Sequence, residues 1–141
     1  MTKQLLKGFW AAGLVAGLAV LSVSAEAAEI RCDVPFSFTV NGKTLPAGTY
    51  RVSIEPTQGT LFVRGYAQAA FALSNRVQSP NDTSAKLVFH KYGDQYILKE
   101  AWMGGVSGRE LPTSRLERAL ARAAQDRKVA TSFERVVIPV L

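Results

Sequence analysis

Apolar and polar residues alternate along the stretch from residue 30 to residue 40. Every even position carries an apolar side chain, and every odd position carries a polar residue or proline. Because successive side chains of a β-strand point to opposite faces, this pattern predicts a strand with one buried and one solvent-facing side. Pro35 lies on the outer side and cannot donate a ladder hydrogen bond, which indicates an edge strand or a bulge.

Turn residues divide the next part of the chain. Asn41-Gly42 is typical of a tight hairpin turn, since both residues tolerate positive φ. A second turn is predicted at 45–48, where Pro46 fixes φ and Gly48 is free to adopt a left-handed conformation. The strands expected after these turns cover 50–55, 60–64 and 67–76. Their expected inward-facing residues include Tyr50, Val52, Ile54, Ala67, Ala69, Phe71 and Leu73.

The segment from Lys86 to Met103 predicts a β-hairpin centred on Gly93-Asp94. A two-residue turn at this point pairs Phe89 with Leu98 and His90 with Ile97. One face of the hairpin is then expected to carry Leu87, Phe89, Tyr96, Leu98 and Trp102. The glycine-rich residues 104–112 are interpreted as a connection.

Helical spacing begins only after residue 113. Ser114 and Glu117 match a capping box, in which each side chain satisfies a free backbone N–H of the first turn. Leu116, Ala119, Leu120 and Ala123 recur with a helical period, so we expect a helix from about Ser114 to Lys128. The apolar residues 133–141 predict a closing strand, and Pro139 places it at an edge.

Short strands, frequent turns and one late helix together predict a single, mainly β domain. The pattern fits an antiparallel β-sandwich or a partly open β-barrel with one C-terminal α-helix. We find no internal repeat or linker that indicates a second domain.

Three segments occur in a characteristic order: "VPFSFTVNGKTLPAGTYRV", "LVFHKYGDQYILKEAW" and "GRELPTSRLERALA". In this order the chain resembles a family of short, uncharacterised exported bacterial β-domain proteins. The resemblance covers nearly all of residues 28–141, and its motifs are turns and apolar alternation. It implies export and a single domain, and it carries no catalytic residues.

The N-terminal segment has the pattern of a signal peptide. Lys3 and Lys7 precede an uncharged run over 9–23, and Ala25 and Ala27 have the spacing that signal peptidase recognises. The alternative is an uncleaved anchor, but the run is shorter than the roughly 20 residues that span a bilayer. We expect a cleaved signal peptide over 1–27 and a single domain over 28–141 without a transmembrane segment. The protein is then exported, to the periplasm or the medium.

Positive charge suggests anionic partners. Loss of Lys3, Lys7 and Glu26 with the signal peptide changes the formal net charge from +6 to +5. A basic exported protein attracts lipid head groups, acidic polysaccharide or nucleic acid.

A stripe of arginines on the expected helix is the candidate contact surface. Arg115, Arg118 and Arg122 are three and four residues apart, so they lie on one side of the helix. We expect them to bind an anionic envelope component, either a lipid head group or a polysaccharide. The alternative is a solvated face with Glu117 and Asp126 as local ion-pair partners. No aromatic residue interleaves the arginines, which makes nucleic acid the weakest candidate partner.

Residues with catalytic or metal-binding chemistry form no recognisable pattern. His90 is the only histidine and no GxSxG motif is present, so we interpret His90 as a surface or strand-flank residue. Cys32 falls on the buried side of its strand, which favours a core thiol over an intermolecular disulfide. The carboxylates are scattered without the spacing of a metal site. The sequence therefore predicts no catalytic residue, no metal and no cofactor.

These observations favour a non-enzymatic, exported binding or structural module of the cell envelope. Two alternatives stay open. One is a secreted or periplasmic hydrolase with a carboxylate site that the sequence does not reveal. The other is an assembly subunit that adds a strand to a neighbour's sheet.

Overall fold

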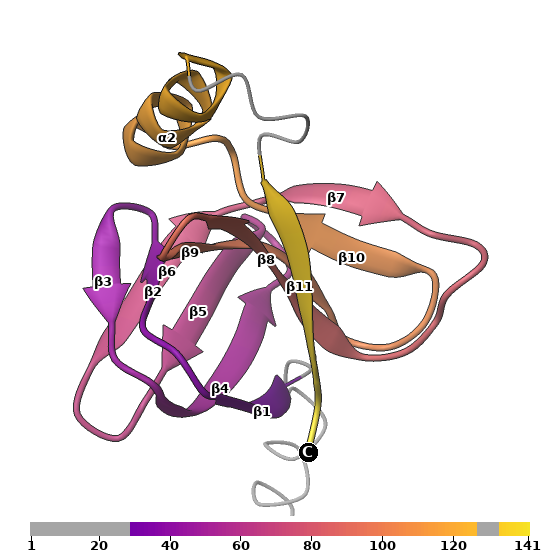
Figure 1. Ribbon diagram of the computed structural model, residues 1–141. Helices are drawn as coiled ribbons and strands as arrows, with labels where there is room; N and C mark the ends of the chain where they lie inside the picture. Colours follow the sequence, from indigo (N-terminus) through magenta and orange to yellow (C-terminus); the bar gives the residue numbers. More distant parts are fainter. Residues whose placement is uncertain (1–28, 127–132) are drawn as a thin grey trace, which may run out of the picture.

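The computed structural model describes residues 29–126 and 133–141 (Figure 1). The signal peptide predicted over 1–27 lies outside the described residues, as do residues 127 and 128 of the predicted helix. The strands are β1 (Glu29–Val34), β2 (Phe38–Val40), β3 (Lys43–Leu45), β4 (Gly48–Glu55), β5 (Thr60–Arg64), β6 (Ala69–Leu73), β7 (Asn75–Gln78), β8 (Lys86–Tyr92), β9 (Gln95–Trp102), β10 (Ser107–Glu110) and β11 (Glu134–Pro139). The helix α2 (Arg115–Asp126) lies between β10 and β11.

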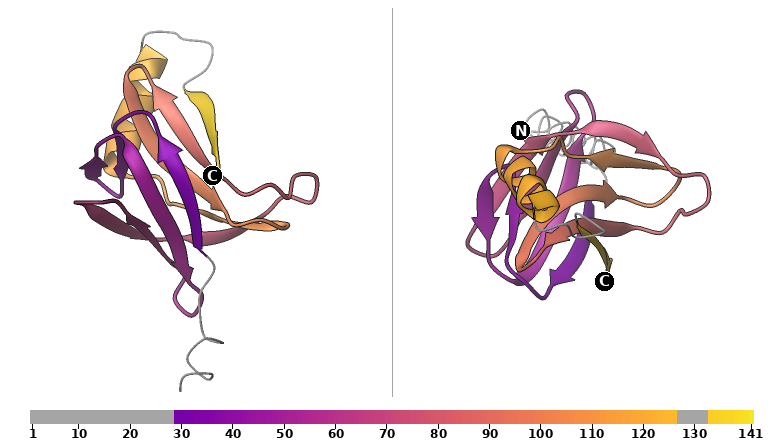
Figure 2. Two further views of the ribbon diagram at one scale, coloured as in Figure 1. Left: turned by 90° about the horizontal axis from the view of Figure 1, so that it is seen from below. Right: turned by 45° about the horizontal axis from the view of Figure 1, so that its top comes forward.

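The strands form two sheets that pack face to face around one apolar core. The four-stranded sheet has the order β1-β4-β5-β6, and the seven-stranded sheet has the order β11-β8-β9-β10-β7, with β2 and β3 attached at β9. The strands β7 and β10 extend the larger sheet beyond the smaller one (Figures 1 and 2). The prediction of a mainly β, sandwich-like fold with one late helix is confirmed, and the described residues form no closed barrel.

Side chains from both sheets fill the core. The two largest fully buried ones are Phe38 and Phe89, whose ring centroids lie 5.3 Å apart in an edge-to-face arrangement. Tyr50 of the smaller sheet packs on Phe38 in the same way, with 5.0 Å between the centroids. These aromatic contacts join the two layers at their centre.

The faces predicted for the first alternating stretch are confirmed in β1, whereas Thr39 of β2, expected to face solvent, is buried, and the stretch is divided between the two sheets. Val34 ends β1 and Phe38 begins β2, so the chain crosses from one sheet to the other at Pro35. The turn at Asn41-Gly42 is confirmed, with φ of 48° and 83°. The expectation for Gly48 is wrong, because this residue begins β4 without a positive φ.

The alternation predicted over 67–76 is wrong by one residue. Ala70 and Ala72 face the core, whereas Phe71 and Leu73 are 65% and 66% exposed. The two alanines lie opposite Val63 and Leu61 of β5, whose larger side chains already fill this part of the core. After Leu73 the chain leaves the smaller sheet and forms β7 in the larger one.

The β8–β9 hairpin has the predicted turn and pairing, including Phe89 opposite Leu98. A bulge leaves Lys99 without a partner on β8 and reverses the alternation beyond it. Ala101 therefore faces the core, and Trp102 is buried on the other side of the sheet. There it packs against Gly108, where a Cβ atom would lie 2.5 Å from the indole ring. Residues 107–110, interpreted from sequence as part of a connection, thus form a strand over Trp102.

Candidate functional site

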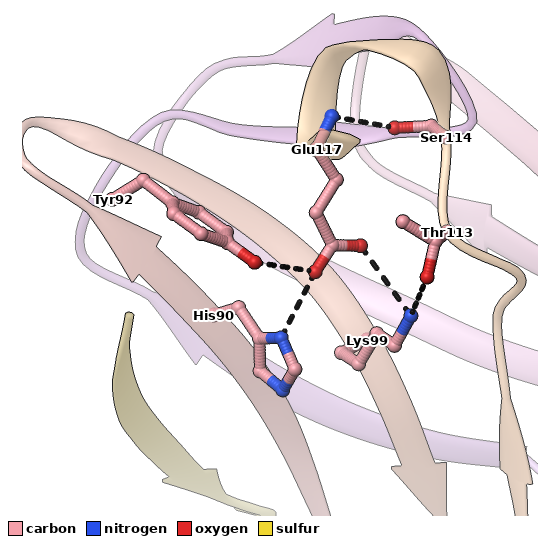
Figure 3. A network of polar contacts seen from close by, with 6 residues as sticks. All are labelled: His90, Tyr92, Lys99, Thr113, Ser114 and Glu117. Carbon is pink, nitrogen blue, oxygen red and sulfur yellow. Dashed lines mark hydrogen bonds and ion pairs between the residues drawn. The ribbon is translucent and has the colours of Figure 1, made fainter. Parts of the chain in front are cut away.

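The start of α2 is fixed by Ser114, whose Oγ accepts a hydrogen bond from the Glu117 backbone N–H at 3.2 Å. This half of the capping box is confirmed. The other half is not formed. The Glu117 carboxylate turns away from the helix start and contacts side chains of β8 and β9 in the seven-stranded sheet (Figure 3).

The buried side of α2 is rotated from the predicted one. Leu116 and Ala119, which we expected to be inward, are exposed. The other two predicted positions, Leu120 and Ala123, are half-buried, as are Ala121 and Ala124, while Glu117 is buried. The helix is therefore attached through a charged residue as well as through small apolar ones.

Glu117 is the centre of a buried polar network (Figure 3). Its Oε2 accepts a hydrogen bond from Tyr92 Oη at 2.9 Å and lies 3.0 Å from His90 Nδ1. Its Oε1 lies 3.4 Å from Lys99 Nζ, which also donates to Thr113 Oγ1 at 3.0 Å. The network links α2 to β8, β9 and the segment that precedes the helix.

The interpretation of His90 as a surface residue is wrong. Its side chain is 13% exposed, and its ring stacks on Phe133 with 3.8 Å between centroids. The burial of His90 could not be predicted from its own segment, because Glu117 and Phe133, which cover it, come from later parts of the chain. Lys99 lies on the same face as His90, because Ile97 is opposite His90 and Lys99 is two residues further along β9, and there it meets Glu117.

The network favours a charged Glu117. Burial opposes ionisation of this carboxyl, but the hydrogen bonds from Tyr92 and His90 and the charge of Lys99 outweigh it and hold the Glu117 pKa below its ordinary value. Burial, followed by the hydrogen bond and charge of Glu117, raises the pKa of Tyr92 far above its ordinary value. Tyr92 therefore remains a neutral donor to a carboxylate.

The contacts of Glu117 attach α2 to β8 and β9. Within residues 29–126 and 133–141, no serine, threonine or cysteine hydrogen-bonds His90 Nε2, so the carboxylate–histidine pair is not extended to a nucleophile. In the same part of the chain, no three His, Cys, Asp or Glu side chains are grouped to hold a metal ion.

The stability of the fold should depend on pH through Glu117. Because folding lowers its pKa from the ordinary value of about 4.3, the carboxylate stabilises the fold above roughly pH 5, and this contribution is lost as pH falls through the folded-state pKa. Glu117→Gln removes the titration. Urea unfolding of the two proteins should therefore differ most at neutral pH, and the difference should shrink with acidification. A difference that is constant with pH would contradict this assignment.

Arg115, Arg118 and Arg122 are exposed on the side of α2 away from Glu117. The suggestion that Glu117 is their local ion-pair partner is wrong, because Glu117 is buried against Lys99. The stripe is thus accessible, and its predicted role in binding stays a prediction.

A second group of arginines lies on the outer face of the four-stranded sheet. Arg31 is directly opposite Arg51, which is directly opposite Arg64, across β1, β4 and β5. We call these three residues the arginine row. They line a hollow of about 440 Å³ whose other lining residues are Glu29, Thr49, Gly65 and Tyr66. Among the described residues, the ion pairs that form involve none of the three arginines.

Sequence reasoning missed the arginine row. Arg31 and Arg51 both occupy outward positions of predicted strands, which was the available signal. Their juxtaposition depends on the pairing of β1 with β4, however, and β2 and β3 intervene in the sequence but belong to the other sheet. The order of strands along the chain therefore does not reveal that β1 pairs with β4.

Cys32 is fully buried in the core as a free thiol, which confirms the core interpretation. Burial, together with the nearby charge of Asp33, raises its pKa to about 11. A thiol with these properties is inert as a nucleophile at neutral pH.

In the part of the chain that the structure describes, no helix has the length and apolar character needed to cross a membrane. No protein-family model, curated protein or solved structure matches the chain. The resemblance to short exported bacterial β-domain proteins stays a prediction.

Proposed function

We propose that the protein is an exported, non-enzymatic binding module that holds an anionic component of the cell envelope on its arginine row. The observation that carries this proposal is the direct cross-strand succession of Arg31, Arg51 and Arg64 around one hollow. Guanidinium groups bind phosphate and carboxylate through paired, charge-assisted hydrogen bonds. Three of them on adjacent strands form a site for a group with several negative oxygens.

Electrostatic repulsion within the row supports the same function. Like charges directly opposite each other destabilise a β-sheet. The three arginines have no ion-pair partner among the described residues. A bound anion would relieve their repulsion, so its binding should also raise the stability of the fold.

The arginine row is a better candidate than the helix stripe of Arg115, Arg118 and Arg122. The row surrounds a hollow and stands on three hydrogen-bonded strands, so its side chains converge on one volume. The stripe lies on the convex outer side of a helix. The row belongs to the four-stranded sheet and the stripe to α2, which is attached to β8 and β9 of the other sheet, so the two groups can be tested separately.

Isothermal titration with inositol hexakisphosphate tests the proposal. The row variant carries Arg31→Ser, Arg51→Ser and Arg64→Ser. The stripe variant carries Arg115→Ser, Arg118→Ser and Arg122→Ser and loses the same charge. We expect the row variant to bind at least about tenfold more weakly than the unmodified protein, and the stripe variant to change less than about twofold, because contact charges contribute more than distant, screened ones.

The relative losses decide the outcome. Equal weakening of both variants would mean that binding follows net charge alone, which would contradict a site at the row. Weaker binding by the stripe variant alone would mean that the anion binds to the stripe on α2 and not to the row. Thermal unfolding of each variant is the control, and neither set of exposed substitutions should lower the melting temperature appreciably.

A further inference from the structure

An apolar surface adjoins the arginine row on the same face of the four-stranded sheet. It consists of Phe62, Phe71 and Leu73, which we call the apolar ledge. Phe62 lies opposite Phe71 across β5 and β6, with 6.3 Å between the ring centroids. Phe71 and Leu73 are among the most exposed large apolar side chains of the described residues. Figure 1 shows β4, β5 and β6 side by side in this layer.

The orientation of β6 makes the ledge unusual. A sheet with one solvent-facing side normally turns its larger apolar residues inward and its polar residues outward. In β6 the inward residues are Ala70 and Ala72, and the outward ones include Phe71 and Leu73. Grouped apolar side chains that remain exposed beside charged ones are typical of an interaction surface.

The ledge and the row are one continuous surface. The Arg64 guanidinium carbon lies 5.3 Å from the centroid of the Phe62 ring, so a cation–π contact joins them. Tyr66, on the turn between β5 and β6, is fully exposed and lines the hollow of the row. Lys43 donates from Nζ to the Ala69 carbonyl at 2.6 Å and adds a positive charge beside β6.

We propose that this combined face binds the surface of a bilayer that contains anionic lipids. The inference rests on the proposed function and names the partner of the same site. The arginines would bind lipid phosphates, while Phe71, Leu73 and Tyr66 would enter the interfacial region, where aromatic side chains are favoured. The strands already hold both groups on one face, so binding needs no rearrangement.

The chemistry of the ledge favours lipid over polysaccharide. An acidic polysaccharide would satisfy the arginines, and its sugars stack on aromatic rings. It offers no apolar phase for Leu73, however, whereas a bilayer does. The one carboxylate that lines the hollow, Glu29, belongs to β1 at the opposite edge of the sheet from β6. We therefore expect the lipid contact to be centred over β4, β5 and β6.

Vesicle co-sedimentation separates the ledge from the row. The vesicles contain phosphatidylcholine alone or with about one third phosphatidylglycerol, a fraction high enough for a clear negative surface potential. The ledge variant carries Phe71→Ser and Leu73→Ser. A matched control carries Val106→Ser and Leu116→Ser, two apolar residues that are exposed elsewhere. Each protein is also titrated with inositol hexakisphosphate, which reports the row without a bilayer.

We expect the unmodified protein to bind the anionic vesicles and not the neutral ones. The ledge variant should lose at least about fivefold in vesicle partitioning, because two apolar insertions are removed, and should keep its affinity for inositol hexakisphosphate. The control should match the unmodified protein. A Phe71→Trp reporter should shift its fluorescence to the blue on anionic vesicles.

Failure of the lipid proposal and failure of the proposed function give different results. Vesicle binding that survives in the ledge variant would overturn the inference in favour of charge alone. Binding of inositol hexakisphosphate without vesicle binding would overturn the lipid partner and leave the proposed function standing. Ledge-dependent binding to a uronic acid polysaccharide, with no vesicle binding, would replace lipid by polysaccharide. Failure to bind either probe would overturn the proposed function as well.

Discussion

Replacement of Glu117 by alanine should lower the free energy of unfolding by about 3–5 kcal/mol, because it leaves a buried lysine without its carboxylate. The side chains of Glu117 and Lys99 are 4% and 9% exposed. The substitution also removes the acceptor for Tyr92 Oη and the partner of His90 Nδ1. Each of these largely buried polar groups then loses a hydrogen bond.

A second glutamate provides the control. Glu134 also pairs with a lysine, Lys91, but its side chain is 71% exposed and the charged atoms are 3.9 Å apart. Glu134→Ala should therefore lower the free energy of unfolding by less than about 1 kcal/mol. Urea unfolding at pH 7 measures both variants. If the two losses were alike, the network would not be the anchor of α2.

Replacement of Phe38 by alanine should also lower the free energy of unfolding by about 3–5 kcal/mol, because it opens a cavity where the two sheets meet. Phe38 is fully buried, and its ring packs edge to face on both Tyr50 and Phe89. No neighbouring side chain can fill the lost volume without breaking these contacts.

The matched substitution Phe71→Ala tests the reversed alternation of β6. The same atoms are removed from an outward position that is 65% exposed, so the expected loss is below about 1 kcal/mol. Urea unfolding of the two phenylalanine variants compares them directly. A loss at Phe71 as large as that at Phe38 would mean that Phe71 belongs to the core, as the alternation of the sequence alone indicated.

Alternation predicts a strand's inward side where apolar and polar residues differ clearly. This holds for β1 and β4, because only one side of each can be buried without desolvating charge. It fails for β6, whose sequence "AAFAL" is apolar at every position, so the neighbours of the strand decide which side faces the core. It also fails beyond Lys99, because a bulge adds one residue and reverses the sides.

The Glu117 network and the arginine row were hidden for a different reason. The Glu117 network needs side chains from β8, β9 and α2, and the capping-box pattern assigned Glu117 a local role that it does not have. The arginine row depends on the register between β1 and β4, which the intervening β2 and β3 conceal. Single-sequence reasoning detects contacts that are local or periodic, and both sites depend on tertiary pairing.

Binding of an anion at the arginine row is the central claim, and a nuclear magnetic resonance titration tests it most directly. Inositol hexakisphosphate is added to the ¹⁵N-labelled protein, and the backbone amide signals are followed residue by residue. We expect the largest shifts around Arg31, Arg51 and Arg64, on β1, β4 and β5, and little change along α2. Shifts confined to α2, or spread evenly over the basic surface, would contradict the claim.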